Sequence, residues 1–158
     1  MPNKKRIITN LCVIHQHPRI LLGMKKRRFG AGRWNGFGGK VERVESIEES
    51  LMREVQEEAG IRPLDAEKVG YMEFEFENND ELIEVHLFKS ASFEGEPKES
   101  EEMKPAWFHI DEIPFDQMWP DDKHWMPLFL SGKKFKGKFL FGSGDAILKQ
   151  ELYEVEEI

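Results

Sequence analysis

The stretch from Gly39 to Ile61 constrains the fold more than any other part of the chain, because it combines helix signals with a cluster of carboxylates. Ser46 is typical of a helix N-cap, and Glu49 three residues later completes a capping box. Gly60 is typical of a helix end. Apolar residues recur between these signals at every fourth position, namely Ile47, Leu51 and Val55. The pattern predicts a helix of about four turns.

Three carboxylates border the apolar stripe of this predicted helix: Glu54, Glu57 and Glu58. At about 100° per residue they fall in one sector beside the stripe. Like charges three and four residues apart repel one another, so the cluster needs a cationic partner. Mg²⁺ suits it, with Mn²⁺ as a substitute, because a hard cation takes oxygen ligands and keeps positions for water and phosphate. The alternative is an ordinary acidic face in contact with water.

The same stretch resembles the motif of the Nudix hydrolases. The positions that match are Gly39, Glu45, Arg53, Glu54, Val55, Glu57, Glu58, Gly60 and Ile61. The resemblance implies a metal-dependent pyrophosphohydrolase that cleaves a nucleoside diphosphate linked to another group. It also implies an α/β/α sandwich with a mixed sheet.

Length and composition narrow the class of protein further. A chain of 158 residues, 39% of them hydrophobic, is long enough for one well-packed domain, which we expect over residues 1–158. The net charge of −7 argues against binding to a nucleic-acid backbone. A single cysteine, Cys12, indicates a reducing compartment, and no apolar run has the length of a membrane span. We expect a monomer in the cytoplasm, with the nucleus or mitochondria as further locations.

The rest of the chain predicts strands on both sides of this helix and a second, shorter helix. Strands are expected at 6–15, 20–24, 69–77, 83–87, 106–110, 135–141 and 146–155. The second helix is expected at 122–130, interrupted or started by Pro127. In the strand at 69–77, alternation places Met72, Phe74 and Phe76 on one face. This order favours an α/β (α+β) fold, in which a mixed sheet is packed between helices.

Segments outside the motif resemble one branch of the Nudix family, the hydrolases of oxidised purine nucleoside triphosphates: residues 22–27, 29–40 and 118–122. This resemblance implies hydrolysis of 8-oxo-dGTP and 2-hydroxy-dATP to the monophosphate and pyrophosphate, which removes mutagenic nucleotides from the pool. It places metal on the Gly38 carbonyl, Glu54, Glu57, Glu58 and Glu102. Arg53 is implied to fix the rotamers of the motif glutamates. Glu57 or Glu58 is also a candidate to orient the attacking water, and sequence does not separate ligand from base.

The same resemblance implies the substrate contacts. It assigns the purine edges to Asn35, Asp121 and Asp122, and the apolar walls to Phe29, Phe74, Ile83 and Trp119. Further candidate contacts are Asn10, Lys25, Phe37, Gly38, Gly39, Lys40 and Pro120. The chain departs from its close relatives at Asn10, where they have threonine, at Ile83, where they have methionine, and at Arg43 and Val44, where a glycine turn is common. These departures leave open the activity and the preference among oxidised purines.

The neighbouring carboxylates Asp121 and Asp122 have a physical consequence of their own. Two carboxylates near one ligand in an apolar pocket do not both ionise readily, so one is expected to keep its proton. A protonated carboxyl donates a hydrogen bond, whereas an ionised one only accepts. We hypothesise that the pair matches two oxidised purines by moving a proton. The alternative is that one aspartate caps the following helix.

Two other functions compete with this interpretation. One is a Nudix hydrolase of other substrates, such as diadenosine polyphosphates, ADP-ribose or ordinary dNTPs. The other is a nucleotide-binding module without catalysis, against which the complete set of motif glutamates argues. The aromatic residues Phe76 and Trp125 are expected in the core rather than in the pocket.

Overall fold

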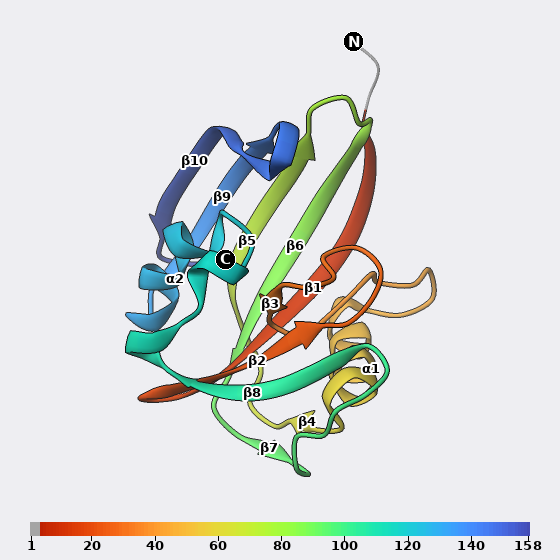
Figure 1. Cartoon of the computed structure of the whole chain (residues 1–158), viewed down its shortest axis with the longest axis vertical. Coiled ribbons are helices and arrows are strands. Elements are labelled where there is room, and N and C mark those ends of the chain that lie inside the picture. Colours follow the sequence, from red (N-terminus) through yellow and green to blue (C-terminus); the bar gives the residue numbers. More distant parts are fainter. Residues whose placement is uncertain (1–3) are drawn as a thin grey trace.

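The computed structural model describes residues 4–158, and this part of the chain forms an eight-stranded sheet with flanking helices (Figure 1). The strands follow the order β10-β9-β5-β6-β1-β2-β3, and β8 pairs with β2. Their bounds are β1 Lys5–Gln16, β2 Arg19–Lys25, β3 Trp34–Asn35, β5 Glu67–Phe76, β6 Glu81–Ser90, β8 Met103–His109, β9 Lys134–Phe141 and β10 Ile147–Val155. The short strands β4 (Arg62–Pro63) and β7 (Phe93–Glu94) pair with each other.

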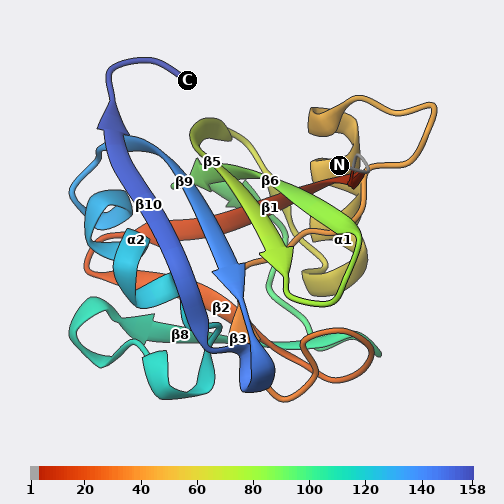
Figure 2. The same ribbon diagram turned by 90° about the horizontal axis from the view of Figure 1, so that it is seen from above.

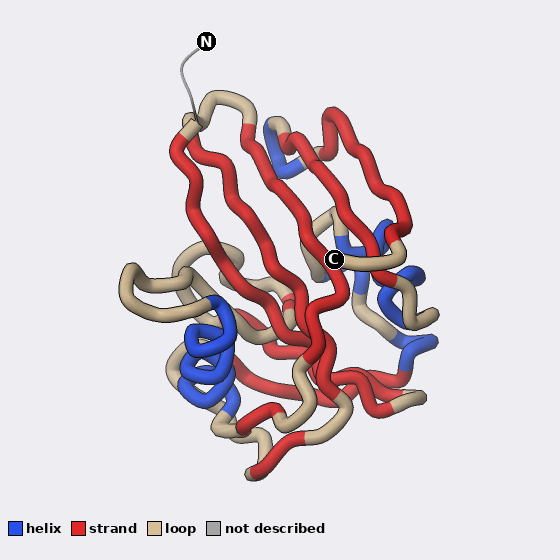
Figure 3. Tube along the Cα trace, turned by 180° about the vertical axis from the view of Figure 1, so that it is seen from behind, coloured by secondary structure: helices blue, strands red, loops and turns tan. Residues whose placement is uncertain are grey.

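The sheet is mixed, as the sequence predicts. β1 pairs with β6 and β5 with β9 in parallel, while the other pairs are antiparallel. Figure 3 shows the long strands side by side, with the longer helix to the left of their lower ends. β8 begins three residues before the predicted start, because its register with β2 extends from His109 back to Met103. Pro105 is tolerated within it since β8 pairs, among the described strands, with β2 alone.

The long helix α1 (Ile47–Ala59) confirms the predicted start and end. The Ser46 side chain accepts a hydrogen bond from the Glu49 N–H, and the Glu49 carboxylate accepts one from the Ser46 N–H. Gly60 ends the helix in the left-handed conformation, with φ of 70°. Because the capping box and the glycine fix both ends, the motif glutamates occupy defined positions on the last turns of α1.

The helices α1 and α2 (Asp122–Leu130) cover opposite faces of the sheet (Figure 2). Alternate residues of β1 show this directly: Cys12 packs in the cluster that contains α1, and Val13 packs in the cluster that contains α2. The α2 side is rich in aromatic residues, including Trp125 and Phe129. The shorter 3₁₀ segments η1 (Ile110–Glu112), η2 (Phe115–Gln117) and η3 (Ser143–Asp145) lie between strands or before α2.

The described residues include no helix with both the length and the apolar character to cross a membrane.

Packing of α1 should be sensitive to its central leucine. Leu51 is 1% exposed, so Leu51→Ala should lower the free energy of unfolding by about 2–5 kcal/mol through a buried cavity. Urea denaturation followed by circular dichroism measures this change. Val44→Ala is the control, because Val44 is 95% exposed and its truncation should change stability by less than about 0.5 kcal/mol. Equal effects of the two substitutions would contradict the assigned packing.

Candidate active site

A cavity of about 210 Å³ extends from the beginning of α2 to the last turns of α1. Its walls come from β1, β5, β6, the glycine-rich segment after β2, and the loop before α2. The predicted site residues that line it are Asn10, Lys25, Phe29, Asn35, Gly38, Gly39, Glu58, Phe74, Ile83, Trp119, Asp121 and Asp122. One hollow therefore joins the predicted base-reading residues to the motif helix.

Aromatic rings form much of the apolar wall. The Trp119 ring centroid lies 5.0 Å from that of Phe29 and 6.2 Å from that of Phe76. Phe76 in turn stacks on Phe141, with their centroids 5.2 Å apart. Phe76 and Trp125 pack with the core as expected, but both also line the cavity, which corrects the expectation that they lie away from the pocket.

Several lining residues escaped the sequence analysis: Thr9, Leu11, Gly30, Gly36, Met72, Phe76, Val85, Met103, Trp125 and Phe141. The alternation of β5 was a usable signal for Met72 and Phe76, because it puts them on the face of Phe74. Phe141 had no such local signal. It reaches the wall because β9 runs parallel to β5 and sets Phe141 beside Phe76.

Asp121 and Asp122 are buried at the end of the cavity next to α2, with exposed fractions of 4% and 3%. Asp121 Oδ2 accepts a hydrogen bond of 2.8 Å from the indole N–H of Trp125. Asp122 Oδ2 is buried and has no hydrogen-bond partner among the described residues. The Asp121 side chain makes no capping bond to the described backbone of α2, so the capping alternative is wrong for Asp121.

The two aspartates have different electrostatic surroundings. Burial and the adjacent Asp121 carboxylate raise the pKa of Asp122 well above its usual value. Burial also raises the pKa of Asp121, but the hydrogen bond from Trp125 opposes this rise. A proton on this pair is therefore favoured on Asp122 over Asp121.

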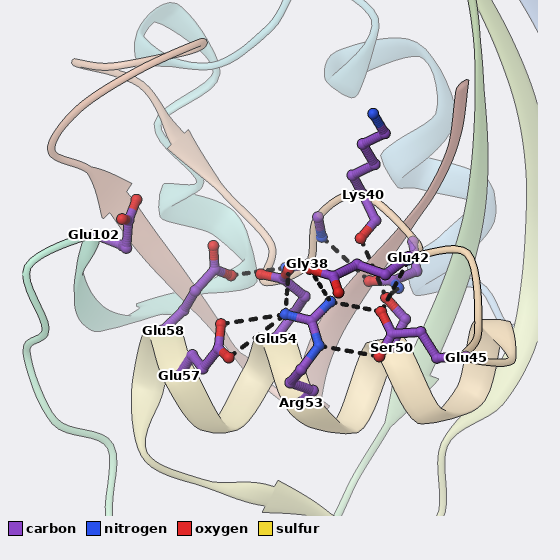
Figure 4. Close-up of polar contacts among 12 residues, drawn as sticks. Gly38, Lys40, Glu42, Glu45, Ser50, Arg53, Glu54, Glu57, Glu58 and Glu102 are labelled. Atoms are coloured by element: carbon purple, nitrogen blue, oxygen red, sulfur yellow. Dashed lines mark hydrogen bonds and ion pairs between the residues drawn. The ribbon is translucent and has the colours of Figure 1, made fainter. Parts of the chain in front are cut away.

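Glu58 is the motif carboxylate that reaches the cavity (Figure 4). It is 3% exposed, and its Oε1 accepts a hydrogen bond of 2.8 Å from the Gly38 N–H. The Lys25 ammonium lies 4.0 Å from Glu58 Oε2. Burial raises the pKa of Glu58 to about 8 despite these two contacts. A buried carboxylate of this kind gains most from an additional positive charge.

Arg53 connects the other motif glutamates (Figure 4). Its Nη1 donates to Glu54 Oε1 at 3.0 Å and to Glu57 Oε2 at 3.3 Å. Its Nε and Nη2 donate to the two oxygens of Glu45 at 3.0 and 2.6 Å. This bidentate contact lowers the pKa of Glu45 to about 2.

The predicted metal ligands do not form a ready cluster. In the described part of the chain, no three side chains of histidine, cysteine, aspartate or glutamate lie close enough together to hold a metal ion. Glu102 instead accepts from Arg27 Nε at 2.8 Å, and Glu54 and Glu57 contact Arg53. The donor set still fits a hard cation in its chemistry, because it consists of oxygens and includes a buried carboxylate with a raised pKa.

Three predicted substrate contacts do not line the cavity: Phe37, Lys40 and Pro120. Phe37 is fully buried in the α1 cluster, because its bridge to Cys12 turns the ring to that side of the sheet. Lys40 is exposed, and its side chain points away from the glutamates (Figure 4). Pro120 is half-buried in the turn before α2, between the lining residues Trp119 and Asp121.

Asn10 lines the cavity, and its side chain also makes two hydrogen bonds within the protein. Its Nδ2 donates to Ser50 Oγ at 2.8 Å, and its Oδ1 accepts from the Gly39 N–H at 3.2 Å. The amide thus ties the glycine-rich segment to α1.

The raised pKa of Asp122 should be visible in the stability of the protein. The stabilising contribution of a carboxyl with a raised pKa is present below its ordinary value of 3.8 and is lost as the pH rises through the raised value. Asparagine stays neutral like the protonated acid, so Asp122→Asn and wild type should have the same unfolding free energy at low pH. As the pH rises, wild type loses stability and the variant should become the more stable of the two. Urea denaturation across the pH range measures it.

Asp116→Asn, on exposed η2, is the matched control and should show no such growth. A constant difference between Asp122→Asn and wild type at all pH values would contradict a protonated Asp122.

The chain is similar to known proteins in both sequence and fold. Residues 4–129 match the NUDIX domain. The chain is 50% identical over 151 residues to the oxidized purine nucleoside triphosphate hydrolase of Danio rerio, covering 96% of this chain and 97% of that protein. It is 52% identical over 146 residues to the Mus musculus protein of the same name, covering 92% and 94%.

A solved structure of a MutT protein from Bacillus halodurans superposes with a TM-score of 0.81 at 31% identity, covering 92% of this chain and 97% of that one. The fold, the motif helix and these relatives lead to one conclusion. This chain belongs to the Nudix hydrolase family.

Proposed function

We propose that the protein hydrolyses oxidised purine nucleoside triphosphates, with 8-oxo-dGTP and 2-hydroxy-dATP as substrates, to the monophosphate and pyrophosphate. The observation that carries this proposal is the buried pair Asp121 and Asp122 at one end of an aromatic cavity whose other end reaches Glu58. The relatives from Danio rerio and Mus musculus, similar over nearly their whole length, support the same substrate class. Mg²⁺ as the ion and a cytoplasmic monomer as the active form are parts of this proposal.

The base end of the cavity offers both stacking and hydrogen bonding. Trp119 presents a flat indole to a purine ring. Asn35 Oδ1 accepts a hydrogen bond of 2.8 Å from the Gly36 N–H, so the amide nitrogen is the group of Asn35 that can donate to a base. Asp121 and Asp122 add an acceptor and a protonated donor. Moving their single proton would change the pattern presented to the base, which suits two oxidised purines with different edges.

The phosphate end provides charge and a base. Lys25 lines the cavity beside Glu58, so its ammonium is placed to bind a phosphate oxygen. A bound Mg²⁺, with Glu54, Glu57, Glu58, Glu102 and the Gly38 carbonyl as proposed ligands, would supply charge neutralisation and a more acidic water. Arg53 would hold Glu54 and Glu57 through the contacts described above. Glu58 lines the cavity as a buried carboxylate with its Oε2 4.0 Å from the Lys25 ammonium, so it is placed to accept a proton from the attacking water.

A nucleotide panel tests the proposed substrate class. We expect pyrophosphate release from 8-oxo-dGTP and 2-hydroxy-dATP with a kcat/KM at least about tenfold above that for dGTP and dATP, because the cavity is built to read donors and acceptors. Chelation of divalent cations should abolish release. Equal rates on dGTP and 8-oxo-dGTP would contradict a role in removing oxidised nucleotides from the pool. No release from any nucleotide would favour a nucleotide-binding module without catalysis. Preference for ADP-ribose or diadenosine polyphosphates would favour the other Nudix activities.

Glu58→Gln should lower kcat by on the order of 10²-fold or more while leaving the fold intact, because it removes both a charge and a proton acceptor. Steady-state pyrophosphate release measures it. Glu48→Gln is the matched control, since Glu48 lies exposed in the first turn of the same helix and should leave kcat unchanged. An active Glu58→Gln enzyme would contradict the assigned role.

Because the two aspartates share one proton, we expect the pH profile of kcat/KM to differ between the two substrates. Asp121→Asn and Asp122→Asn each fix one donor pattern, so each variant should change the ratio of kcat/KM for 8-oxo-dGTP and 2-hydroxy-dATP by at least about tenfold. Each variant keeps one titrating carboxyl but loses the coupling within the pair, so its pH profile should differ in shape from that of wild type. Profiles that match wild type for both substrates would show that the pair does not read the base.

A further inference from the structure

Trp119 lies in an irregular segment between η2 and α2, so backbone pairing in a strand does not orient its ring. The orientation depends on what the indole touches. Phe76 and Phe141 meet it edge-on, with centroids 6.2 and 5.9 Å away. Phe29, which is 65% exposed, touches it from the cavity mouth. A well-defined stacking surface needs a further support.

Arg33 provides a contact of a different kind. Its guanidinium carbon lies 4.1 Å from the centroid of the Trp119 ring, so the planar cation covers one face of the indole. A flat base is therefore excluded from that face of the indole.

Arg33 is itself fixed in place. Its Nη2 lies 3.1 Å from Asp145 Oδ2, in the turn η3 between β9 and β10. The backbone of Arg33 is also tied to the end of β2, because its carbonyl accepts from the Lys25 N–H at 3.0 Å. Three segments far apart in the sequence therefore meet at this indole.

The contact of Arg33 with Asp145 is poorly suited to a purely stabilising role. The two side chains are 28% and 34% exposed, and ion pairs with that much water contribute little to stability. The positive charge of Arg33 also acts on the base-reading pair, where it partly opposes the rise in the pKa of Asp122. Arg33 thus faces two elements of the base-binding end at once.

We propose that Arg33, held by Asp145, is a positioning residue that backs Trp119 and presents the indole to the oxidised base. The inference rests on the proposed function, and it adds to it two residues that lie outside the motif and outside the cavity lining. The pair acts on base binding, so its loss should raise KM and leave kcat nearly unchanged.

The test compares Arg33→Met, Arg33→Lys and Asp145→Asn. Arg33→Met should raise KM for 8-oxo-dGTP by about threefold to tenfold, the range expected when a cation over an indole is lost, with kcat within about twofold of wild type. Arg33→Lys keeps a cation and should restore part of the loss. Asp145→Asn should raise KM less, and the double variant Arg33→Met with Asp145→Asn should be no worse than Arg33→Met alone.

Arg19→Met is the matched control. Arg19 stacks on Trp107 with its guanidinium carbon 4.4 Å from the ring centroid. The Arg19→Met substitution therefore removes the same type of contact as Arg33→Met. Trp107 packs in the α1 cluster and does not line the cavity. Arg19→Met should therefore affect thermal stability as much as Arg33→Met but leave KM at the wild-type value.

Binding of 8-oxo-dGMP, followed by tryptophan fluorescence, separates failure of the inference from failure of the function. If wild type releases pyrophosphate and Arg33→Met retains its KM, or if Arg19→Met raises KM equally, the inference is overturned and the function stands. If wild type binds 8-oxo-dGMP without turnover, the dissociation constants of the same variants decide the inference. If wild type neither binds nor hydrolyses, both the function and the inference are overturned.

Discussion

Three buried carboxylates, Glu58, Asp121 and Asp122, account for how the cavity and the segments around it are arranged. Glu58, Asp121 and Asp122 are each at most 4% exposed, and they lie at the two ends of one cavity. Removing a charged carboxylate from water is costly unless a partner compensates it. Glu58 has the Gly38 N–H and Lys25, Asp121 has Trp125, and Asp122 Oδ2 lacks a partner among the described residues. Burial of these carboxyl groups lowers the stability of the fold, so we attribute it to the binding of a ligand in the cavity.

The glycine-rich segment before α1 is shaped by the same carboxylates. A Cβ at Gly39 would lie 2.8 Å from the Glu54 carboxyl carbon, so any other residue at this position would displace the Glu54 carboxylate. Asn10 then fastens this segment to Ser50 of α1. Close approach of the backbone to the helix is what lets the Gly38 N–H reach Glu58. The residues of the motif are therefore required for packing as well as for the chemistry of the site.

Cations of the chain itself lie beside the carboxylates expected to bind metal. Arg53 holds Glu45, Glu54 and Glu57, and Arg27 holds Glu102. A divalent ion at this site would compete with these arginines for the same oxygens, so their contacts set both the orientation and the availability of the ligands. At the other end of the cavity, aromatic packing orients Trp119, which is in contact with rings from β5 and β9.

Elements with local signals could be predicted from the sequence. The capping box and Gly60 predicted α1, and the alternation in β5 predicted the face of Phe74. The second helix has the predicted bounds, Asp122–Leu130, but Pro127 neither begins nor interrupts it. Periodicity and caps act over a few residues, so they can be read without the fold. Three features of the site had no local signal: Phe141 joins the cavity wall, Phe37 turns into the α1 core, and Arg33 meets Asp145 behind Trp119. These facts depend on strand pairing and on contacts between distant segments, which local patterns do not specify.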